Sequence, residues 1–396
     1  MTSPSVAARH PRVSAVDSSE ARFVAHLRSQ ASRYIPGLRV QQTTVRMVQH
    51  IIRKHSSLLE FEVTDGTLRK NVICKIPFSL QDTANTEPMD EDRPRLFPTS
   101  EAVSIGQREY LGLESIAQHF SALNDDRFGA IAVLELLESP FVVVMEKSED
   151  RSLKSLLKKS TRFHCLTRNA SELQAAFRNA GAWLREFHAM PALPHTKERH
   201  SDRACYIDSV LRFTDALILK LNHKLYFRDV RQQLESAAMR ILPREVPCAT
   251  VHGDFAPRNI LIGTNSRVTV IDTQRRWIAP VYEDLAYLLM SVKLSRLQMS
   301  SQGLIFSRRQ LAIWESDLLI GYFASSSISL AAVRLYEVLL SLEWWTAISF
   351  RSAGDSGFKR LGNDLCNRYL FRYVEGLLKD LKNPLPASES LHSFLH

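Results

Sequence analysis

The first third of the chain combines one helical pattern with several strand patterns. Residues 21–33 mix apolar and charged positions as a short amphipathic helix does, and Pro36-Gly37 ends it. Three runs rich in β-branched and aromatic residues follow, and Asp65-Gly66 between two of them is a strong hairpin signal. We therefore expect antiparallel strands within 45–53, 58–63 and 71–76.

Further elements complete this part of the chain. Apolar side chains recur at helical spacing over 104–120, and two more strand patterns cover 131–137 and 140–147. A polar stretch with few large apolar residues, at 81–100, is expected to be an insertion. Residues 21–146 are predicted to form a small β-rich lobe.

From Ser152 onwards the periodicity is mostly helical. The clearest amphipathic helix covers 172–190, and His188 near its end is expected to pack or cap rather than to bind a ligand. Further helices are expected at 204–224, 228–241, 285–293, 316–323, 330–350 and 365–381. Residues 147–384 are predicted to form a larger, mainly helical lobe, with loose tails at 1–20 and 385–396.

Length and composition are those of an ordinary soluble protein. The 396 residues suffice for two lobes, and no apolar run is long enough to cross a bilayer. The start lacks the apolar core of a secretory signal, and the five cysteines are far apart and odd in number. We therefore expect reduced thiols and a cytoplasmic location.

The formal charge of +9 favours an anionic partner. Nucleotides, phosphorylated sugars, membrane surfaces and nucleic acids all meet that description. The chain has no nucleic-acid-binding motif and no long block of basic residues, so nucleic acid is not expected as the partner.

The chemistry concentrates in a polar loop between two apolar runs. Asp254 is a carboxylate that can accept the proton of an attacking hydroxyl, and Asn259, five positions later, offers a neutral oxygen to a metal ion. Asp272, at the end of the next apolar run, offers a charged oxygen. Mg²⁺ usually takes only one or two protein carboxylates, so this sparse set suits a nucleotide-bound magnesium. The alternative is a hairpin loop with an Asx-turn at Asp254 and an internally satisfied Asn259.

Residues 252–286 carry a family resemblance. The sequence His252-Gly253-Asp254 through Asn259, followed by Ile271-Asp272 and Asp284-Leu285-Ala286, resembles the aminoglycoside phosphotransferase and choline kinase superfamily. The resemblance implies an α+β, bilobal protein-kinase-like fold, with a small antiparallel N-lobe and a larger helical C-lobe. It also implies Mg²⁺-dependent transfer of the γ-phosphoryl group of ATP or GTP to a hydroxyl of a small molecule.

The resemblance further implies roles for particular residues. His252 would organise the catalytic loop and Asp284 would brace it. Lys75, in a Val-x-x-Lys strand, would bind the α and β phosphates, with Glu109 as its ion-pair partner. A surface lysine on an edge strand is the alternative for Lys75, and Glu114 or an exposed helix face are the alternatives for Glu109.

The order of elements also places a hinge between the lobes. Backbone groups at Met145, Glu146 and Lys147 would meet the nucleotide base.

Three features depart from the family pattern. No glycine occurs in 41–60, where a phosphate-covering flap is expected, so backbone amides of a turn at Ser56-Ser57 would have to serve. Asp272-Thr-Gln replaces the Asp-Phe-Gly of protein kinases, which favours a small-molecule acceptor. The tract 274–278 is not acidic, which favours a neutral or anionic acceptor such as a sugar, a glycoconjugate or an antibiotic-like molecule.

Two questions stay open at the level of sequence. Arg258, Arg275 and Arg276 could stabilise transferred phosphate or an anionic substrate, or could be ordinary exposed arginines. A catalytically weak nucleotide-binding regulatory protein, or a protein kinase, are the alternative functions.

Overall fold

The structure is a computed structural model that describes most of the chain. The described residues are 15–53, 56–77, 100–139, 141–160, 170–199, 201–324, 329–351 and 357–382. The predicted insertion up to residue 99, the predicted tail 385–396 and Cys165 lie outside them. The other four cysteines are free thiols.

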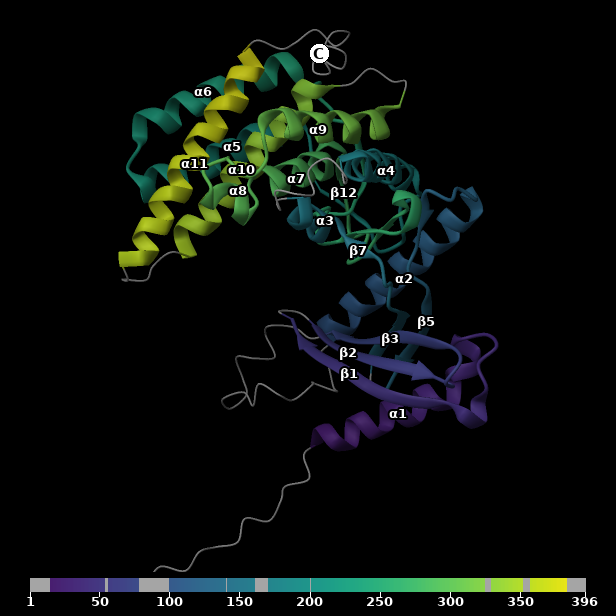
Figure 1. The fold of residues 1–396 in the computed structure, drawn as a ribbon. Helices are drawn as coiled ribbons and strands as arrows, with labels where there is room; N and C mark the ends of the chain where they lie inside the picture. The colour runs from purple at the N-terminus through teal and green to yellow at the C-terminus, as the bar shows by residue number, and fades with distance from the viewer. Residues whose placement is uncertain are drawn as a thin grey trace, which may run out of the picture. The chain divides into compact units, whose positions relative to one another are not determined.

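The chain divides into two compact units (Figure 1). One comprises residues 1–114 and 131–148, and the other comprises residues 115–130 and 149–396. Among the described residues the first unit is built on an antiparallel sheet and the second is mainly helical, so the α+β fold class is confirmed.

The sheet of the first unit has five strands in the order β1-β2-β3-β6-β5, and all neighbours are antiparallel. The predicted strands are all present. They are β1 (Thr44–Ile52), β2 (Ser56–Thr64), β3 (Arg69–Pro77), β5 (Val133–Glu138) and β6 (Phe141–Glu146).

The β2–β3 hairpin forms at the predicted dipeptide. Gly66 has a φ of +89°, a left-handed conformation that glycine adopts without steric cost. The Asp65 carboxylate accepts hydrogen bonds from the backbone N–H groups of Thr67 (2.9 Å) and Leu68 (2.7 Å). These bonds close the turn and fix the register of both strands.

The prediction of a turn at Ser56-Ser57 is wrong. Both serines are buried and begin strand β2, where they pair with Pro77 and Ile76 of β3. The Ser57 hydroxyl is bonded to His50 of β1, with 2.7 Å between Oγ and Nε2. Because the Ser57 hydroxyl has a hydrogen-bond partner inside the sheet, both serines are accommodated in strand β2 instead of forming a turn.

Two helices belong wholly or partly to the first unit. Helix α1 (Ala15–Tyr34) begins within the segment assigned to the N-terminal tail. It buries Phe23, Leu27 and Ala31 in a core shared with the sheet, and Figure 1 shows it alongside strand β1. Helix α2 (Ser100–Leu123) belongs to this unit as far as Glu114. A short 3₁₀ turn, η1 (Val40–Gln42), precedes β1.

Two small sheets carry the polar loops of the second unit. One has the order β4-β11-β10-β7 and the other β8-β12-β9. The bounds are β4 (Phe128–Gly129), β7 (Arg151–Ser152), β8 (Lys197–Glu198), β9 (Cys248–Val251), β10 (Ile260–Ile262), β11 (Val268–Val270) and β12 (Trp277–Pro280). The 3₁₀ turn η3 (Thr264–Ser266) joins β10 to β11.

The helices of the second unit follow the predicted pattern. They are α3 (Leu153–Ser160), α4 (Ala170–Ala189), α5 (Arg203–Leu221), α6 (Lys224–Ile241), α7 (Tyr282–Lys293), α8 (Arg296–Ser300), α9 (Arg308–Phe323), α10 (Leu330–Arg351) and α11 (Gly357–Lys382). The five-residue helix α8 is too short to show a periodicity and was not predicted. No helix in the described part of the chain is long and apolar enough to span a membrane.

Helix α4 is the central helix of this unit. It packs very closely on α9, because a Cβ atom at Gly181 would lie 2.0 Å from the carbonyl oxygen of Leu318, and one at Gly321 would lie 1.9 Å from that of Arg178. On another side, Trp183 and Phe187 of α4 stack with a 14° angle between their rings. Trp183 also stacks on Phe255, at 6.1 Å between centroids, so the helix reaches the polar loop.

Candidate active site

The polar loop between β9 and β10 is anchored by its one aromatic residue. Phe255 is fully buried against Trp183 of α4. Gly253 has a φ of +78°, which turns the chain as it leaves β9. Asp254, between these two residues, keeps about a third of its side chain exposed (36%). The loop is therefore held in the core while its carboxylate faces solvent.

Asn259 and Arg258 both bind the Asp254 carboxylate. The Asn259 amide nitrogen donates to the backbone oxygen of Asp254 and to its Oδ2, both at 2.9 Å. The Arg258 guanidinium donates to both carboxylate oxygens, at 2.6 Å for Oδ2. Because these bonds use the nitrogen of the buried Asn259, its amide oxygen is the group left for a cation.

Asp284 binds the start of the same loop. Its carboxylate accepts from the backbone N–H groups of His252 (2.6 Å) and Gly253 (2.9 Å), and from Nε2 of His188 (3.1 Å). Burial raises the pKa of Asp284, but the hydrogen bond from His188, the backbone hydrogen bond from His252 and the favourable electrostatics of both residues outweigh burial and hold the pKa below its ordinary value. Asp284 is therefore a buried anion whose charge is stabilised by the loop it braces.

Helix α7 begins earlier than predicted, at Tyr282, so Asp284 lies in its first turn rather than in a loop. Negative charge is favourable at the N-terminus of a helix.

His252 uses both ring nitrogens on the backbone. Nε2 lies 3.0 Å from the carbonyl oxygen of Ile271, and Nδ1 accepts from the N–H of Asp254 at 3.2 Å. Because Nδ1 accepts, Nε2 must carry the proton that goes to Ile271. Neither nitrogen is left for a substrate, so the ring ties the Asp254 loop to the end of the β10–β11 hairpin.

Asp272 follows that hairpin directly. The N–H of Ile271 donates to the carbonyl oxygen of Asn259 at 2.9 Å, so Asp272 leaves the sheet next to Asn259. Its side chain is exposed and its φ is +62°, in the left-handed region. Among the described residues no group of three or more His, Cys, Asp and Glu side chains could hold a metal. The predicted ligands, the Asp272 carboxylate and the Asn259 amide oxygen, are oxygen donors of the kind that Mg²⁺ takes while it retains water and phosphate ligands, and their role stays a prediction.

A second charged group lies in the first unit. Nζ of Lys75 on β3 is 2.6 Å from Oε1 of Glu109 on α2, and both side chains are largely buried (15% and 6% exposed). Glu114 accepts instead from the Tyr110 hydroxyl, at 3.4 Å. Glu109, the partner expected for Lys75, is therefore the glutamate that pairs with it.

Strand β6 ends at Glu146, so the predicted hinge at 145–147 covers the end of this strand and the residue after it, and its role stays a prediction. The backbone N–H groups of Glu146 and Lys147 already donate to Ala132 and Asn71, both at 2.9 Å. These two amides are used within the unit, so a contact with a base at these positions would use their carbonyl groups. Met145 is buried between β3 and β5.

Sequence reasoning missed Tyr287, and it left His188 outside the site. The Tyr287 hydroxyl interacts with Asp254 and Arg258, and burial followed by the Asp254 charge raises its pKa. Tyr287 lies three residues after Asp284, so both side chains share one face of α7, a spacing that could have indicated it. His188 joins Asp284 to the Tyr322 hydroxyl, with 2.8 Å between Nδ1 and that oxygen.

The three arginines have separate environments. Arg258 binds Asp254, and Arg276 is exposed with its guanidinium 4.8 Å from the Trp277 ring centroid. Arg275 is buried and donates to Ser115 and to the carbonyl oxygen of Pro191. Arg275 is therefore neither a phosphate contact nor an ordinary exposed arginine. Its guanidinium is bound by acceptors in the interior instead of by water.

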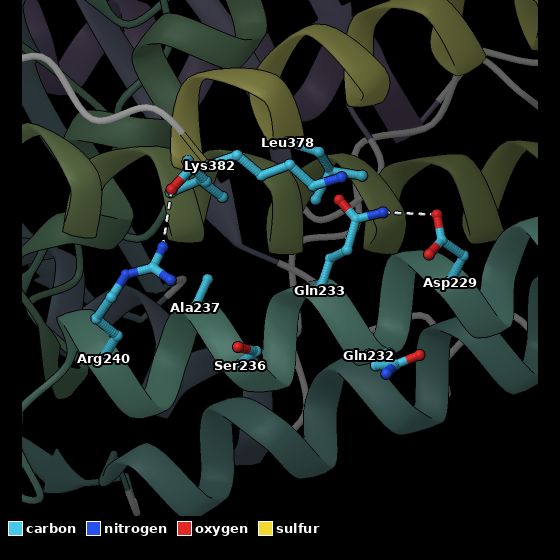
Figure 2. Close-up of a pocket in the computed structure, with 9 residues that line it drawn as sticks. Asp229, Gln232, Gln233, Ser236, Ala237, Arg240, Leu378 and Lys382 are labelled. Carbon is cyan, nitrogen blue, oxygen red and sulfur yellow. Dashed lines mark hydrogen bonds between the residues drawn. The ribbon is translucent and has the colours of Figure 1, made fainter.

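The second unit also contains a cavity of about 280 Å³ between α6 and α11 (Figure 2). Two hydrogen bonds join groups of its lining: Gln233 donates to Asp229 at 2.5 Å, and Arg240 donates to the carbonyl oxygen of Leu381 at 2.8 Å. None of the residues that line it belongs to the Asp254 loop.

Comparison with known proteins supports the motif. Residues 142–315, somewhat under half of the chain, match the model described as the phosphotransferase enzyme family. The matched range contains Asp254, Asn259, Asp272 and Asp284, so the resemblance noted in the sequence is confirmed there. No sequence of a curated protein matches the chain.

Several solved structures resemble the chain at low identity. An ethanolamine kinase from Plasmodium vivax is 13% identical, with 93% of this chain and 90% of that one covered and a TM-score of 0.48. A choline kinase from Streptococcus pneumoniae is 15% identical, with 91% and 99% covered and a TM-score of 0.43. A macrolide 2'-phosphotransferase from Brachybacterium faecium is 11% identical, with 88% and 98% covered and a TM-score of 0.47.

Proposed function

We propose that this chain, whose residues 142–315 match the phosphotransferase enzyme family, transfers the γ-phosphoryl group of ATP or GTP to a hydroxyl of a small molecule. The observation that carries the proposal is the braced loop. An exposed Asp254 carboxylate is oriented by Asn259 and held in place through Asp284. Asp272 follows immediately from the neighbouring hairpin.

Asp254 would act as the base. Its carboxylate is exposed to a substrate, and the Asn259 amide fixes one of its oxygens at 2.9 Å. An acceptor hydroxyl that donates to the other carboxylate oxygen would lose its proton there as the hydroxyl oxygen attacks the γ-phosphorus and the bond from phosphorus to the departing ADP or GDP breaks. Arg258 donates to both oxygens in the described state, so it would have to yield one of them to the acceptor.

The remaining residues would bind the nucleotide. Asn259 and Asp272 would hold Mg²⁺, which supplies neutralisation of phosphate charge when it is bound. Lys75 would bind phosphate oxygens, because a lysine that is largely buried and fixed by Glu109 has lost most of its freedom before the ligand arrives. Met145, Glu146 and Lys147 would contribute backbone groups to the base.

The acceptor would be neutral or anionic. The exposed Arg258 guanidinium is bonded to the proposed base. Such a charge favours a hydroxylated sugar-like or glycoconjugate-like molecule over a polycation. A cytoplasmic location remains a prediction.

Thermal unfolding with ATP and with GTP, each with and without Mg²⁺, tests the proposal. We expect stabilisation of the wild type that requires Mg²⁺ and is lost in Asp272→Ala, because binding to the folded state alone raises its stability. A screen of hydroxylated small molecules for phosphate incorporation then identifies the acceptor. Nucleotide affinity that ignores both Mg²⁺ and the substitution would refute the metal assignment.

One alternative has a specific observation in its favour. The Arg258 guanidinium covers both oxygens of Asp254, and residues 41–60 contain no glycine for a flexible flap. A regulatory protein that binds nucleotide but transfers phosphate poorly would share these features. It predicts Mg²⁺-dependent stabilisation by nucleotide without phosphate incorporation into any small molecule. A protein kinase would instead label polypeptides in a lysate.

A further inference from the structure

The segment that follows Asp272 has an uncommon backbone. Asp272 has a φ of +62° and Arg275 a φ of +47°, and neither is a glycine. Left-handed conformations are costly for residues with a Cβ atom, and arginine is not among the types that tolerate them best. Two such residues within four positions persist only where the surroundings determine the backbone.

The Arg275 side chain is buried in an unusual manner. It is 1% exposed, Nη1 donates to the Ser115 hydroxyl at 2.9 Å, and Nη2 donates to the carbonyl oxygen of Pro191. Its Cζ lies 5.9 Å from the ring centroid of Phe187, and Nε has no hydrogen-bond partner in the described part of the chain.

Burial lowers the pKa of Arg275 to about 10, and the two acceptors of its guanidinium, the Ser115 hydroxyl and the Pro191 carbonyl oxygen, are both neutral. A guanidinium is rarely buried without a carboxylate, so its anchorage calls for a reason.

Three successive carbonyl groups around Arg275 are bound by one neighbouring segment. Nε2 of His195 lies 3.0 Å from the oxygen of Gln274. The Thr196 hydroxyl donates to the oxygen of Arg275, and the N–H of Lys197 donates to that of Arg276, both at 2.9 Å. The chain is therefore fixed from residue 274 onwards, in register with residues 195–197.

The segment is fixed on the other side of Asp272 as well. Ile271 accepts from His252 and donates to the carbonyl oxygen of Asn259. Between the two fixed ends, Asp272 is exposed and Thr273 is fully buried. The backbone at Asp272 is therefore held from both sides.

We propose that Arg275 is a positioning residue for Asp272. Its guanidinium binds Pro191 and Ser115 and thereby holds the left-handed backbone conformation at residues 272 and 275. We infer that this conformation presents the Asp272 carboxylate beside Asn259. This inference rests on the proposed function, because it assigns Asp272 to a Mg²⁺ ion. Residues that orient a metal ligand typically contribute a factor of about 10 to 100 in metal affinity.

Substitutions at Arg275 separate the anchor from the backbone conformation. Glycine adopts a φ of +47° freely but has no guanidinium. If the guanidinium positions Asp272, Arg275→Gly should therefore weaken Mg²⁺-dependent nucleotide binding. Arg275→Lys keeps the positive charge but loses the forked guanidinium that reaches two acceptors. Its Mg²⁺ requirement should lie between those of the wild type and Arg275→Gly. Arg276→Ala is the matched control, because it removes an exposed neighbouring arginine and leaves the backbone bond to Lys197.

The measurement is nucleotide affinity by calorimetry on the full-length protein over a series of Mg²⁺ concentrations. We expect Arg275→Gly to raise the Mg²⁺ concentration for half-maximal nucleotide binding by about 10-fold or more. Saturating Mg²⁺ should restore the wild-type affinity. Hydrogen exchange of amides 271–277 without nucleotide should become faster in the same variant, whereas Arg276→Ala should match the wild type in both measurements.

The outcomes are distinguishable. An unchanged Mg²⁺ requirement in Arg275→Gly would overturn the inference, and so would a loss of affinity that no Mg²⁺ concentration restores, since that is general damage to the fold. If Arg275→Gly does not fold, Arg275→Lys decides by the same criterion. If the wild type shows no Mg²⁺-dependent nucleotide binding, the proposed function itself is refuted. If that binding is present in the wild type and is lost in Asp272→Ala, the proposed function stands whatever the Arg275 variants show.

Discussion

The Lys75–Glu109 pair and the loop carboxylates Asp254 and Asp272 are held in different ways. In the first unit, Lys75 and Glu109 lie on a strand and a helix, are separated by 34 positions, and are largely buried as one ion pair. In the second unit, Asp254 and Asp272 lie in loops, are exposed, and depend on Asp284, His252 and the backbone around them.

The difference shows two routes to a fixed side chain. A residue on regular structure inherits its position from the packing of that element, so a single partner of opposite charge completes the site. A residue in a loop has no such support, and a network of side-chain bonds to backbone groups must supply it. Substitutions should therefore affect stability mainly in the first region and chemistry mainly in the second.

Asp254→Asn should have the largest effect. Turnover should fall by about 10²- to 10⁴-fold, the usual contribution of a general base, while the free energy of unfolding changes little because the side chain is partly exposed. Steady-state kinetics with the identified acceptor measures the first quantity and chemical denaturation the second. Asp215→Asn, at an exposed ion pair with Arg231, is the control. Unchanged turnover in Asp254→Asn would remove that residue from its role.

Lys75→Met should have the largest effect on stability. It leaves Glu109 buried without its partner, which should lower the free energy of unfolding by about 3–5 kcal/mol. Lys70→Met on the same strand is the matched control, since its pair with Glu146 is exposed and should contribute under about 1 kcal/mol.

The double substitution Lys75→Met with Glu109→Leu sharpens the contrast. It should recover much of the lost stability, since no unpaired charge remains, but it should not recover nucleotide binding. A double variant no more stable than Lys75→Met would contradict the assignment of that stability to the ion pair.

Asp284→Asn should have an intermediate effect that depends on pH. Hydrogen bonds to a charged group contribute about 1.5–3 kcal/mol, so the variant should be less stable than the wild type by that order near pH 7. The folded-state pKa of Asp284 is depressed, so this stabilisation is present above the unfolded pKa, about 3.9, and is lost as the pH falls through the folded value.

Urea denaturation of both proteins at neutral pH and below pH 4 measures that dependence. The difference between them should shrink at the lower pH. A difference that is constant, or that grows as the pH falls, would show that the charge of Asp284 is not what braces the loop.

Arg258→Ala should have the smallest effect on stability. Its pair with Asp254 is exposed, so the free energy of unfolding should change by less than about 1 kcal/mol. The ratio of turnover with an anionic and a neutral acceptor is more informative, because only a substrate contact would change it. A stability loss comparable to that of Lys75→Met would contradict the contrast between the two regions.

Much of this protein could be predicted from its sequence because the relevant signals are local. Strand and helix patterns depend on the spacing of apolar residues, and the confirmed strands β1, β2, β3, β5 and β6 follow it. Asp254, Asn259 and Asp272 lie within one short stretch, so their association needs only a loop and a hairpin. The Asp65-Gly66 turn is likewise determined by its own residues.

Other features are decided by residues that are distant along the chain. Ser56 and Ser57 resemble a turn by composition, but pairing with β3 makes them strand. Arg275 resembles an exposed arginine until Ser115, Pro191 and the segment 195–197 surround it. The tertiary structure decided these positions because the acceptors that satisfy a buried polar group belong to other elements, and no local pattern in the sequence records which elements will meet.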